Sequence, residues 1–312
     1  MAAAAPFFDD IANGPEGGAA HWLTTSDKRR IRAGHWPVAG AKGSVLIFPG
    51  RTEYIEKYGI TAQALTAAGY SVLAVDWRGQ GLSDRLIADP RLGHIGDFAD
   101  YQRDVAAVLA HAAALDLPRP YVLLAHSMGG CIGLRALING LDVNAVMFSA
   151  PMWGIQMPRA TRSFAWSLST LSLPLKCDEK LVPGQSATSY PLQQPFAGNM
   201  LTSDPAIYAA LRQQVATHPA LGLGGPTLRW LNKSLQEMRD LSRLRAPAIP
   251  CLTFLGSHES IVDPAAIRSR MARWPGGLLH EIKGGQHEML MDNREMRDSV
   301  TAKTIAHFDA HP

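Results

Sequence analysis

The sequence is poor in cysteine. Its 312 residues include only Cys131, Cys177 and Cys251, and no two of them stand at the CxxC spacing. Structural zinc sites and disulfide-stapled secreted folds both depend on grouped or paired cysteines, so neither is expected. A chain of this length can instead bury a large apolar core, and its cysteine usage suits a reducing compartment.

The sequence also has little excess of one charge over the other, and it has few long apolar runs. With 30 basic and 27 acidic residues the net charge is only +3, which excludes the concentrated basic surface of a dedicated nucleic-acid binder. No apolar stretch approaches the ~20 residues of a membrane-spanning helix. The N-terminus meets Asp9 and Asp10 early and has no basic segment, unlike a secretory signal. We therefore predict a cytoplasmic protein that binds no nucleic acid, and leave open peripheral contact with the inner face of the membrane.

Short apolar runs alternate with longer segments of helical spacing, the pattern of a mostly parallel sheet covered by helices. Strands are predicted at 44–48, 71–76, 121–125, 145–149, 251–255 and 278–282. The alternation stops at Pro151 and resumes near residue 241, and the intervening residues are rich in Pro, Ser and Gly with helical patches. The predicted organisation is an α/β core made of 1–150 and 241–312, with a helical insertion at 151–240. Residues 1–18 are interpreted as a loose arm.

The clearest chemical signal is the segment 123–130, LLAHSMGG, where a predicted strand ends and a helix begins. A serine at such a sharp turn holds its hydroxyl above the sheet, and small residues two positions to either side let strand and helix pass closely. Ala125 replaces the first glycine of the G-x-S-x-G pattern and is still small. Ser127 is therefore the predicted nucleophile, while the neighbouring His126 is interpreted as a packing residue.

A serine nucleophile needs a base, and the base needs an orienting carboxylate. Where this turn occurs, the acid and then the histidine follow the serine along the chain. His287 is the predicted base, because it alone among the later histidines lies in a loop after the last strand. For the acid, Glu259 is preferred, and Asp263 is kept as the alternative because its place before Pro264 also suits a helix N-cap.

The oxyanion of the tetrahedral intermediate needs two backbone N–H donors. Met128, which follows the nucleophile, is predicted to provide one. Arg51, in the loop after the first central strand, is predicted to provide the other, because Gly50 lets the backbone turn inward.

These segments resemble the lysophospholipase and monoacylglycerol lipase group of α/β-hydrolases, and within it the bacterial lysophospholipases. The resemblance covers most of the chain from about residue 45 onward. It rests on seven segments: PGRTEYIEKYG (49–59), DWRGQGLSDR (76–85), DPRLGHIGDFADY (89–101), LLAHSMGG (123–130), SAPMWGI (149–155), GGPTLRW (224–230) and IKGGQHEML (282–290).

The resemblance implies an α/β-hydrolase fold with a helical cap at 151–240, and a serine esterase that works through an acyl-enzyme. Monoacylglycerol lipases of the group usually carry His-Gly at the oxyanion loop and Asp as the acid. This chain has Pro49-Gly50 and Glu259, so a lysophospholipid is expected ahead of a monoacylglycerol. Six cap residues could line an acyl pocket or simply pack the helices together: Met152, Trp153, Met157, Phe164, Trp166 and Trp230.

Three kinds of function are compatible with these residues. The first is hydrolysis of a single-chain lipid ester, most simply as a lysophospholipase, with monoacylglycerol lipase or general carboxylesterase as the alternative. The second is another hydrolysis on the same scaffold, such as release of an N-terminal proline. The third, binding without catalysis, is disfavoured because every catalytic role is filled.

No phosphate-cradling loop or metal-spaced His/Glu set occurs, so no cofactor or metal is expected. Oligomeric state and acyl transfer stay open, as does whether Arg51 pairs with a headgroup phosphate or acts only through its backbone.

Overall fold

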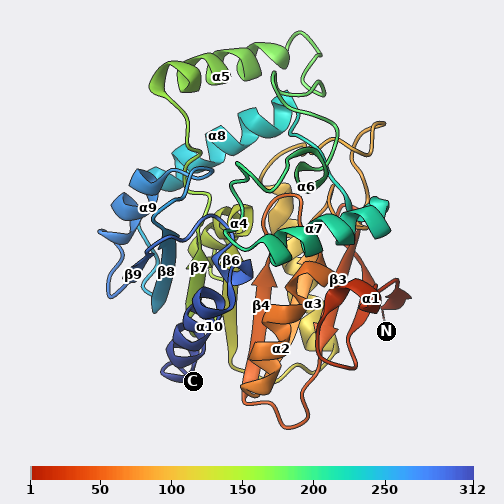
Figure 1. Ribbon diagram of the computed structural model, residues 1–312, viewed down its shortest axis with the longest axis vertical. Helices are drawn as coiled ribbons and strands as arrows, with labels where there is room; N and C mark the ends of the chain where they lie inside the picture. Colours follow the sequence, from red (N-terminus) through yellow and green to blue (C-terminus); the bar gives the residue numbers. More distant parts are fainter. Residues whose placement is uncertain (1) are drawn as a thin grey trace.

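A nine-stranded sheet runs through the computed structural model, which describes residues 2–312 (Figure 1). The strand order is β1-β2-β3-β5-β4-β6-β7-β8-β9. The strands are β1 (Ala3–Ala5), β2 (Ala19–Thr24), β3 (Arg30–Trp36), β4 (Gly43–Phe48), β5 (Tyr70–Asp76), β6 (Tyr121–His126), β7 (Val146–Ser149), β8 (Cys251–Gly256) and β9 (Leu278–Ile282). From β5 to β9 all neighbouring strands are parallel, whereas β1, β2 and β3 are antiparallel additions at one edge.

Helices lie on both faces of this sheet (Figure 1), and two pairs of them, α2 with α10 and α3 with α4, pack against each other. The α-helices are α1 (Asp9–Ala12), α2 (Gly59–Ala67), α3 (Asp100–Ala114), α4 (Met128–Ile138), α5 (Arg159–Ser172), α6 (Tyr190–Gln193), α7 (Pro205–Thr217), α8 (Leu228–Arg243), α9 (Pro264–Met271) and α10 (Arg294–Asp309). Short 3₁₀ helices are η1 (Ile55–Tyr58), η2 (Pro219–Leu221) and η3 (Met289–Met291).

The predicted mostly parallel sheet with flanking helices is confirmed. Each predicted strand is present within one residue at either end. The central strands β4, β5 and β6 are buried along their whole length, as continuous apolar runs in a sheet covered on both faces should be. Because these strands are parallel, their carboxyl ends share one edge of the sheet, and the loops that follow them meet there.

The N-terminal segment is ordered, and the predicted loose arm is wrong for residues 2–18; Met1 lies outside the described residues. β1 pairs with β2, and Ile11 and Ala12 are buried. The buried guanidinium of Arg32 on β3 holds this edge in place by pairing with Asp76 at 2.7 Å and Glu56 at 2.8 Å. The strands at this edge were missed because their apolar residues are few and interrupted by polar ones.

Between β7 and β8 the described chain contains α5 to α8 but adds no strand to the sheet. In Figure 1, α5 and α8 lie beyond the carboxyl ends of the strands, with α5 outermost, and the two helices pack against each other. None of the helices in residues 2–312 is both long enough and apolar enough to cross a membrane.

Candidate active site

Ser127 occupies a strained turn between β6 and α4, with φ 49° and ψ −117°. Such backbone costs about 1–3 kcal/mol for a residue with a side chain and is found mainly at functional sites. The turn is possible because Gly129 follows: a Cβ there would lie 1.9 Å from the carbonyl oxygen of Phe48. Helix and strand therefore approach closely, and the Ser127 side chain is lifted to the edge of the sheet, 7% of the residue being exposed.

His287 lies in the turn after β9 and hydrogen-bonds to two of the predicted residues. Its Nε2 lies 2.9 Å from Ser127 Oγ, and its Nδ1 lies 2.8 Å from Glu259 Oε2. An ionised carboxylate can only accept, so Nδ1 carries the proton and Nε2 is left to accept from the serine hydroxyl. This is the tautomer that a general base needs.

Glu259 is held in position by its surroundings. Its second oxygen accepts the amide N–H groups of Ile261 at 2.7 Å and Val262 at 3.0 Å. Burial opposes ionisation of this carboxyl, but the adjacent His287 and the two amides outweigh it, and the pKa of Glu259 lies below its usual value. The carboxylate is thus charged and fixed where it orients the imidazole.

Asp263, the alternative acid, has a different position. Its side chain accepts from the amides of Ala265 and Ala266 as the N-cap of α9, and it pairs with Arg162 at 3.0 Å. In the structure only Glu259 of the two carboxylates contacts His287.

The loop after β4 approaches Ser127 and is braced from behind. The N–H of Gly50 donates to the carboxylate of Glu53, which also accepts from Tyr58 Oη at 2.6 Å. The neighbouring amide of Arg51 and that of Met128 donate to no acceptor within residues 2–312. Both predicted oxyanion donors are therefore available to a ligand.

Beneath this loop lies a buried ionic cluster that the sequence analysis missed, formed by Glu53, Lys57, His126 and Glu288. The Lys57 ammonium pairs with Glu53 and, at 2.7 Å, with Glu288. His126 Nδ1 lies 3.0 Å from the carbonyl oxygen of Ser149, so it carries a proton, and Nε2 faces Glu288 at 3.5 Å and Glu53 at 3.7 Å. The interpretation of His126 as a packing residue is wrong.

The pKa values of the cluster follow from these contacts. Burial alone would lower the pKa of Lys57 and of His126, but the two carboxylates raise both. Burial would raise the pKa of Glu288, but Lys57 and His126 hold it well below its usual value. The cluster thus places one lysine and one histidine against two carboxylates. Glu53, His126 and Glu288 lie close enough to hold a metal ion, yet Lys57 already supplies positive charge between the carboxylates.

A cavity of about 530 Å³ opens over Ser127 and His287. Most of its wall comes from the segment between β7 and β8, including Met152, Met157 and Trp230 from the predicted set. The other three residues of that set lie elsewhere. Trp153 packs between Phe148 and Trp274, Phe164 is 63% exposed, and Trp166 lies under the guanidinium of Arg239.

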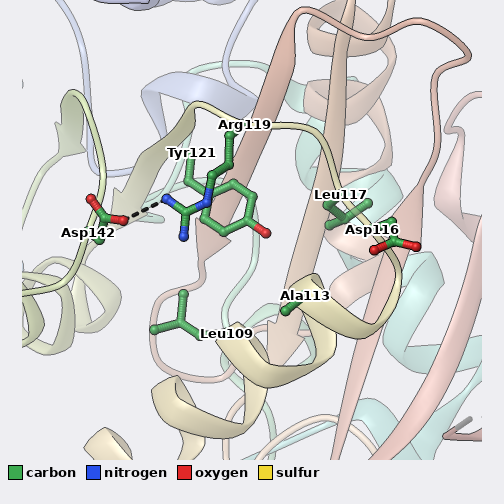
Figure 2. A pocket seen from close by; sticks show the side chains of 7 residues that line it. All are labelled: Leu109, Ala113, Asp116, Leu117, Arg119, Tyr121 and Asp142. Atoms are coloured by element: carbon green, nitrogen blue, oxygen red, sulfur yellow. Dashed lines mark hydrogen bonds and ion pairs between the residues drawn. The ribbon is translucent and has the colours of Figure 1, made fainter.

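A second cavity, of about 350 Å³, lies near the amino end of β6, away from Ser127 (Figure 2). Arg119 crosses it, pairing with Asp142 at 2.6 Å and lying over the ring of Tyr121. Its lining contains no serine or cysteine with a neighbouring histidine, so the cavity over Ser127 is the candidate active site.

Comparison with known proteins agrees with this geometry. The family described as "Serine aminopeptidase, S33" (Hydrolase_4) matches residues 39–294. Lysophospholipase L2 of Escherichia coli is 33% identical over 281 residues, covering 86% of this chain and 80% of that protein. A probable lysophospholipase L2 of Haemophilus influenzae is 30% identical over 289 residues, covering 91% and 90%.

A structural neighbour is the monoglyceride lipase of Saccharomyces cerevisiae, with a TM-score of 0.72, 18% identity and coverage of 93% of this chain and 94% of that one. At that identity the likeness concerns the fold. The predicted α/β-hydrolase resemblance is therefore confirmed: the chain belongs to the serine aminopeptidase S33 family of α/β-hydrolases, in its lysophospholipase and monoacylglycerol lipase group, and is an ester-hydrolysing enzyme.

Proposed function

We propose that this enzyme is a lysophospholipase that cleaves the carboxylic ester of a single-chain lipid through Ser127, His287 and Glu259. The observation that carries the proposal is the continuous hydrogen-bonded chain from Ser127 Oγ through His287 to Glu259 at the base of the 530 Å³ cavity. The names of the curated relatives support the choice of a lysophospholipid.

In the first half-reaction Ser127 Oγ attacks the ester carbonyl carbon while its proton passes to His287 Nε2. The negative charge that forms on the carbonyl oxygen is stabilised by the amides of Arg51 and Met128. Glu259 stabilises the imidazolium that results. The C–O bond to glycerol then breaks, His287 returns the proton to the leaving oxygen, and the acyl group stays on Ser127.

In the second half-reaction water replaces the released alcohol, which is the glycerol that bears the phosphate headgroup. His287 takes a proton from the water, the hydroxide attacks the acyl carbon, and Ser127 leaves with that proton to release the free fatty acid. Since each step uses the same base and the same two amides, the geometry needs no rearrangement between the two halves.

Residues 151–240 act, in this proposal, as a cap that shapes the acyl pocket. Met152, Met157 and Trp230 offer apolar surface to a single chain, and each buried methylene contributes about 0.8 kcal/mol. The cap also contacts the histidine turn directly, because the amide of Glu288 donates to the carbonyl of Leu201 at 2.8 Å. Movement of the cap would therefore shift the turn that carries His287.

The outer face of the cap suits transient contact with a lipid surface. Phe164, Leu171 and Leu175 are 63%, 60% and 71% exposed, and Arg159 and Lys176 are exposed in the same stretch of the chain. Apolar side chains flanked by cations are what an anionic bilayer attracts. A Phe164→Ser/Leu171→Ser double variant should float less with anionic vesicles while retaining full activity on a monomeric ester; unchanged flotation would exclude this surface.

The substrate is tested by comparing kcat/KM for a lysophospholipid, a monoacylglycerol of equal chain length, a short soluble ester and a prolyl arylamide. The lysophospholipid should give the highest value. A tenfold or greater preference for the monoacylglycerol, about 1.4 kcal/mol of transition-state binding, would overturn the assignment of a lysophospholipid as substrate. The assignment of the protein as an esterase would stand. Turnover of only the arylamide would favour the peptidase that the family's description names.

A further inference from the structure

The Arg51 guanidinium lies where three distant segments meet. Its Nη2 donates to the carbonyl oxygen of Gly224, and its carbon lies 5.2 Å from the centre of the Trp230 ring. On another side is Gly93, where a Cβ would lie 2.5 Å from Nη2. The oxyanion loop, the 89–101 segment and the cap thus form one receptacle around this side chain.

No carboxylate pairs with this guanidinium within residues 2–312. Its Nε is buried without an acceptor, and Nη1 makes no hydrogen bond within the same residues. Burial lowers the pKa of Arg51 to about 10, so the group is still charged at neutral pH. Burying an unpaired charge is costly unless an anion completes the site.

Position distinguishes Arg51 from the other cations. Arg85 and Arg270 also bond to backbone carbonyls, but neither lines the cavity over Ser127, whereas Arg51 does. Lys57 lines the same cavity, yet Glu53 and Glu288 already neutralise it. Of the cavity's arginine and lysine side chains in the described chain, only Arg51 has a charge left to offer a ligand.

We propose that the Arg51 side chain is a specificity-determining group that binds the phosphate of a single-chain lipid headgroup. The inference rests on the proposed function, because the substrate must be a lipid ester whose carbonyl lies at Ser127. A guanidinium presents a planar fork of N–H donors that matches phosphate oxygens. One residue would then serve twice: its backbone N–H stabilises the oxyanion, and its guanidinium selects the headgroup.

This division of roles makes the side chain separable from catalysis. Arg51→Met keeps the backbone amide and much of the apolar stem but removes the charge, while Arg51→Lys keeps the charge and removes the fork. The alternative is that Arg51 only clamps the oxyanion loop to Gly224 of the cap. A clamp would act on every ligand alike, whereas a headgroup receptor acts only on ligands that carry phosphate.

The test measures competitive inhibition of a neutral chromogenic ester by two non-hydrolysable lipids of equal chain length, an alkylphosphocholine and an alkylglycerol ether. In Arg51→Met the inhibition constant of the alkylphosphocholine should rise at least tenfold, about 1.4 kcal/mol, while that of the alkylglycerol ether stays within threefold. In Arg51→Lys the inhibition constant of the alkylphosphocholine should lie between those of wild type and Arg51→Met. Arg119→Met, at the cavity of Figure 2 and paired with Asp142, is the matched control and should change neither constant.

An equal rise in the inhibition constants of both lipids would show that Arg51 acts as a clamp and would overturn the proposal. No change in either constant would overturn it too. Inorganic phosphate is assayed in parallel; if it inhibits as strongly as the alkylphosphocholine, the site takes free phosphate and the headgroup assignment fails. Should Arg51→Met be too slow to assay, the same lipids are titrated by calorimetry against Ser127→Ala with and without Arg51→Met. Because no arm uses a lysophospholipid as substrate, failure of the proposed function and failure of this inference give different results.

Discussion

Ser127 shows how one residue's backbone determines its chemistry. A φ of 49° puts the residue in a region that glycine favours, yet a glycine there would have no hydroxyl. The strain is tolerated because β6 and α4 are packed on both sides of the turn and because Gly129 leaves room for the carbonyl of Phe48. The result is a hydroxyl already within hydrogen-bond distance of His287 Nε2.

Replacing Ser127 by Ala should abolish catalysis without unfolding the protein. Alanine meets the same backbone strain as serine, so the melting temperature should change little. Turnover should fall at least ~10³-fold, the scale seen when triad members are removed. Labelling by a fluorophosphonate probe checks the assignment, and a variant labelled as fast as wild type would contradict it.

The two candidate acids should respond differently to loss of charge. Glu259→Gln cannot stabilise the imidazolium of His287 and should lower kcat by roughly 10²–10⁴-fold. Asp263→Asn keeps a good N-cap on α9 and loses only the partly exposed ion pair with Arg162, so its kcat should stay within about threefold. Steady-state kinetics on one ester compares them; the reverse ranking would make Asp263 the acid.

At the scale of elements, the active site depends on contacts between loops that are distant in sequence. Glu53, after β4, receives the N–H of Gly50 and the ammonium of Lys57 on η1. Glu288, next to His287 in the chain, receives the same ammonium. The loop after β4 and the turn that carries His287 are therefore joined through one buried lysine, and His126 lies beside both carboxylates.

Titration of His126 gives this cluster a pH dependence. Its folded-state pKa lies above the ordinary 6.5, so its contribution to stability is fully present below pH 6.5 and is lost as pH rises through the folded value. Glu53 and Glu288 face the ring, and Lys57 pairs with both of these carboxylates. The His287 ring lies against the His126 ring, with 4.8 Å between centroids. The melting temperature of wild type minus that of His126→Gln should be largest near pH 6 and shrink toward pH 9. A difference independent of pH would show that His126 is neutral.

At the scale of the molecule, the N-terminal segment connects the antiparallel edge of the sheet to the helical segment between β7 and β8. Ile11 packs with Tyr54, Val215 and Leu221, and its carbonyl accepts from Gln214 of α7 at 2.8 Å. Asp10 pairs with His218 at 2.9 Å. The N-terminal segment thus links the loop after β4 to α7 and η2.

Deletion of residues 2–12 should therefore destabilise the whole protein. Burial of Ile11 alone contributes about 1.5–3 kcal/mol, and at ~2–4 °C per kcal/mol for a large domain the melting temperature should fall by at least ~3 °C. Differential scanning calorimetry provides the measurement, and removal of only residues 2–5, which keeps Ile11, is the control with a smaller effect. An unchanged melting temperature would restore the interpretation of a loose arm.

The parts that could be predicted from sequence depend on neighbouring residues. The strands at 44–48 and 121–125 are continuous apolar runs, and the turn at Ser127 needs small residues only two positions away. The order of serine, acid and histidine follows from the connectivity of a parallel sheet, so Ser127 and His287 could be singled out along the chain.

Tertiary structure decided what depends on residues far apart. Glu259 and Asp263 stand four apart in one loop, and their roles differ only because the first faces His287 and the second caps α9. His126, Lys57 and Glu288 are ordinary in their local contexts and become a cluster only when three loops converge. Arg51 likewise becomes an unpaired charge only once Gly93, Gly224 and Trp230 surround it. Local sterics act within a few residues and can be read along the chain, whereas burial and electrostatic pairing depend on the folded arrangement.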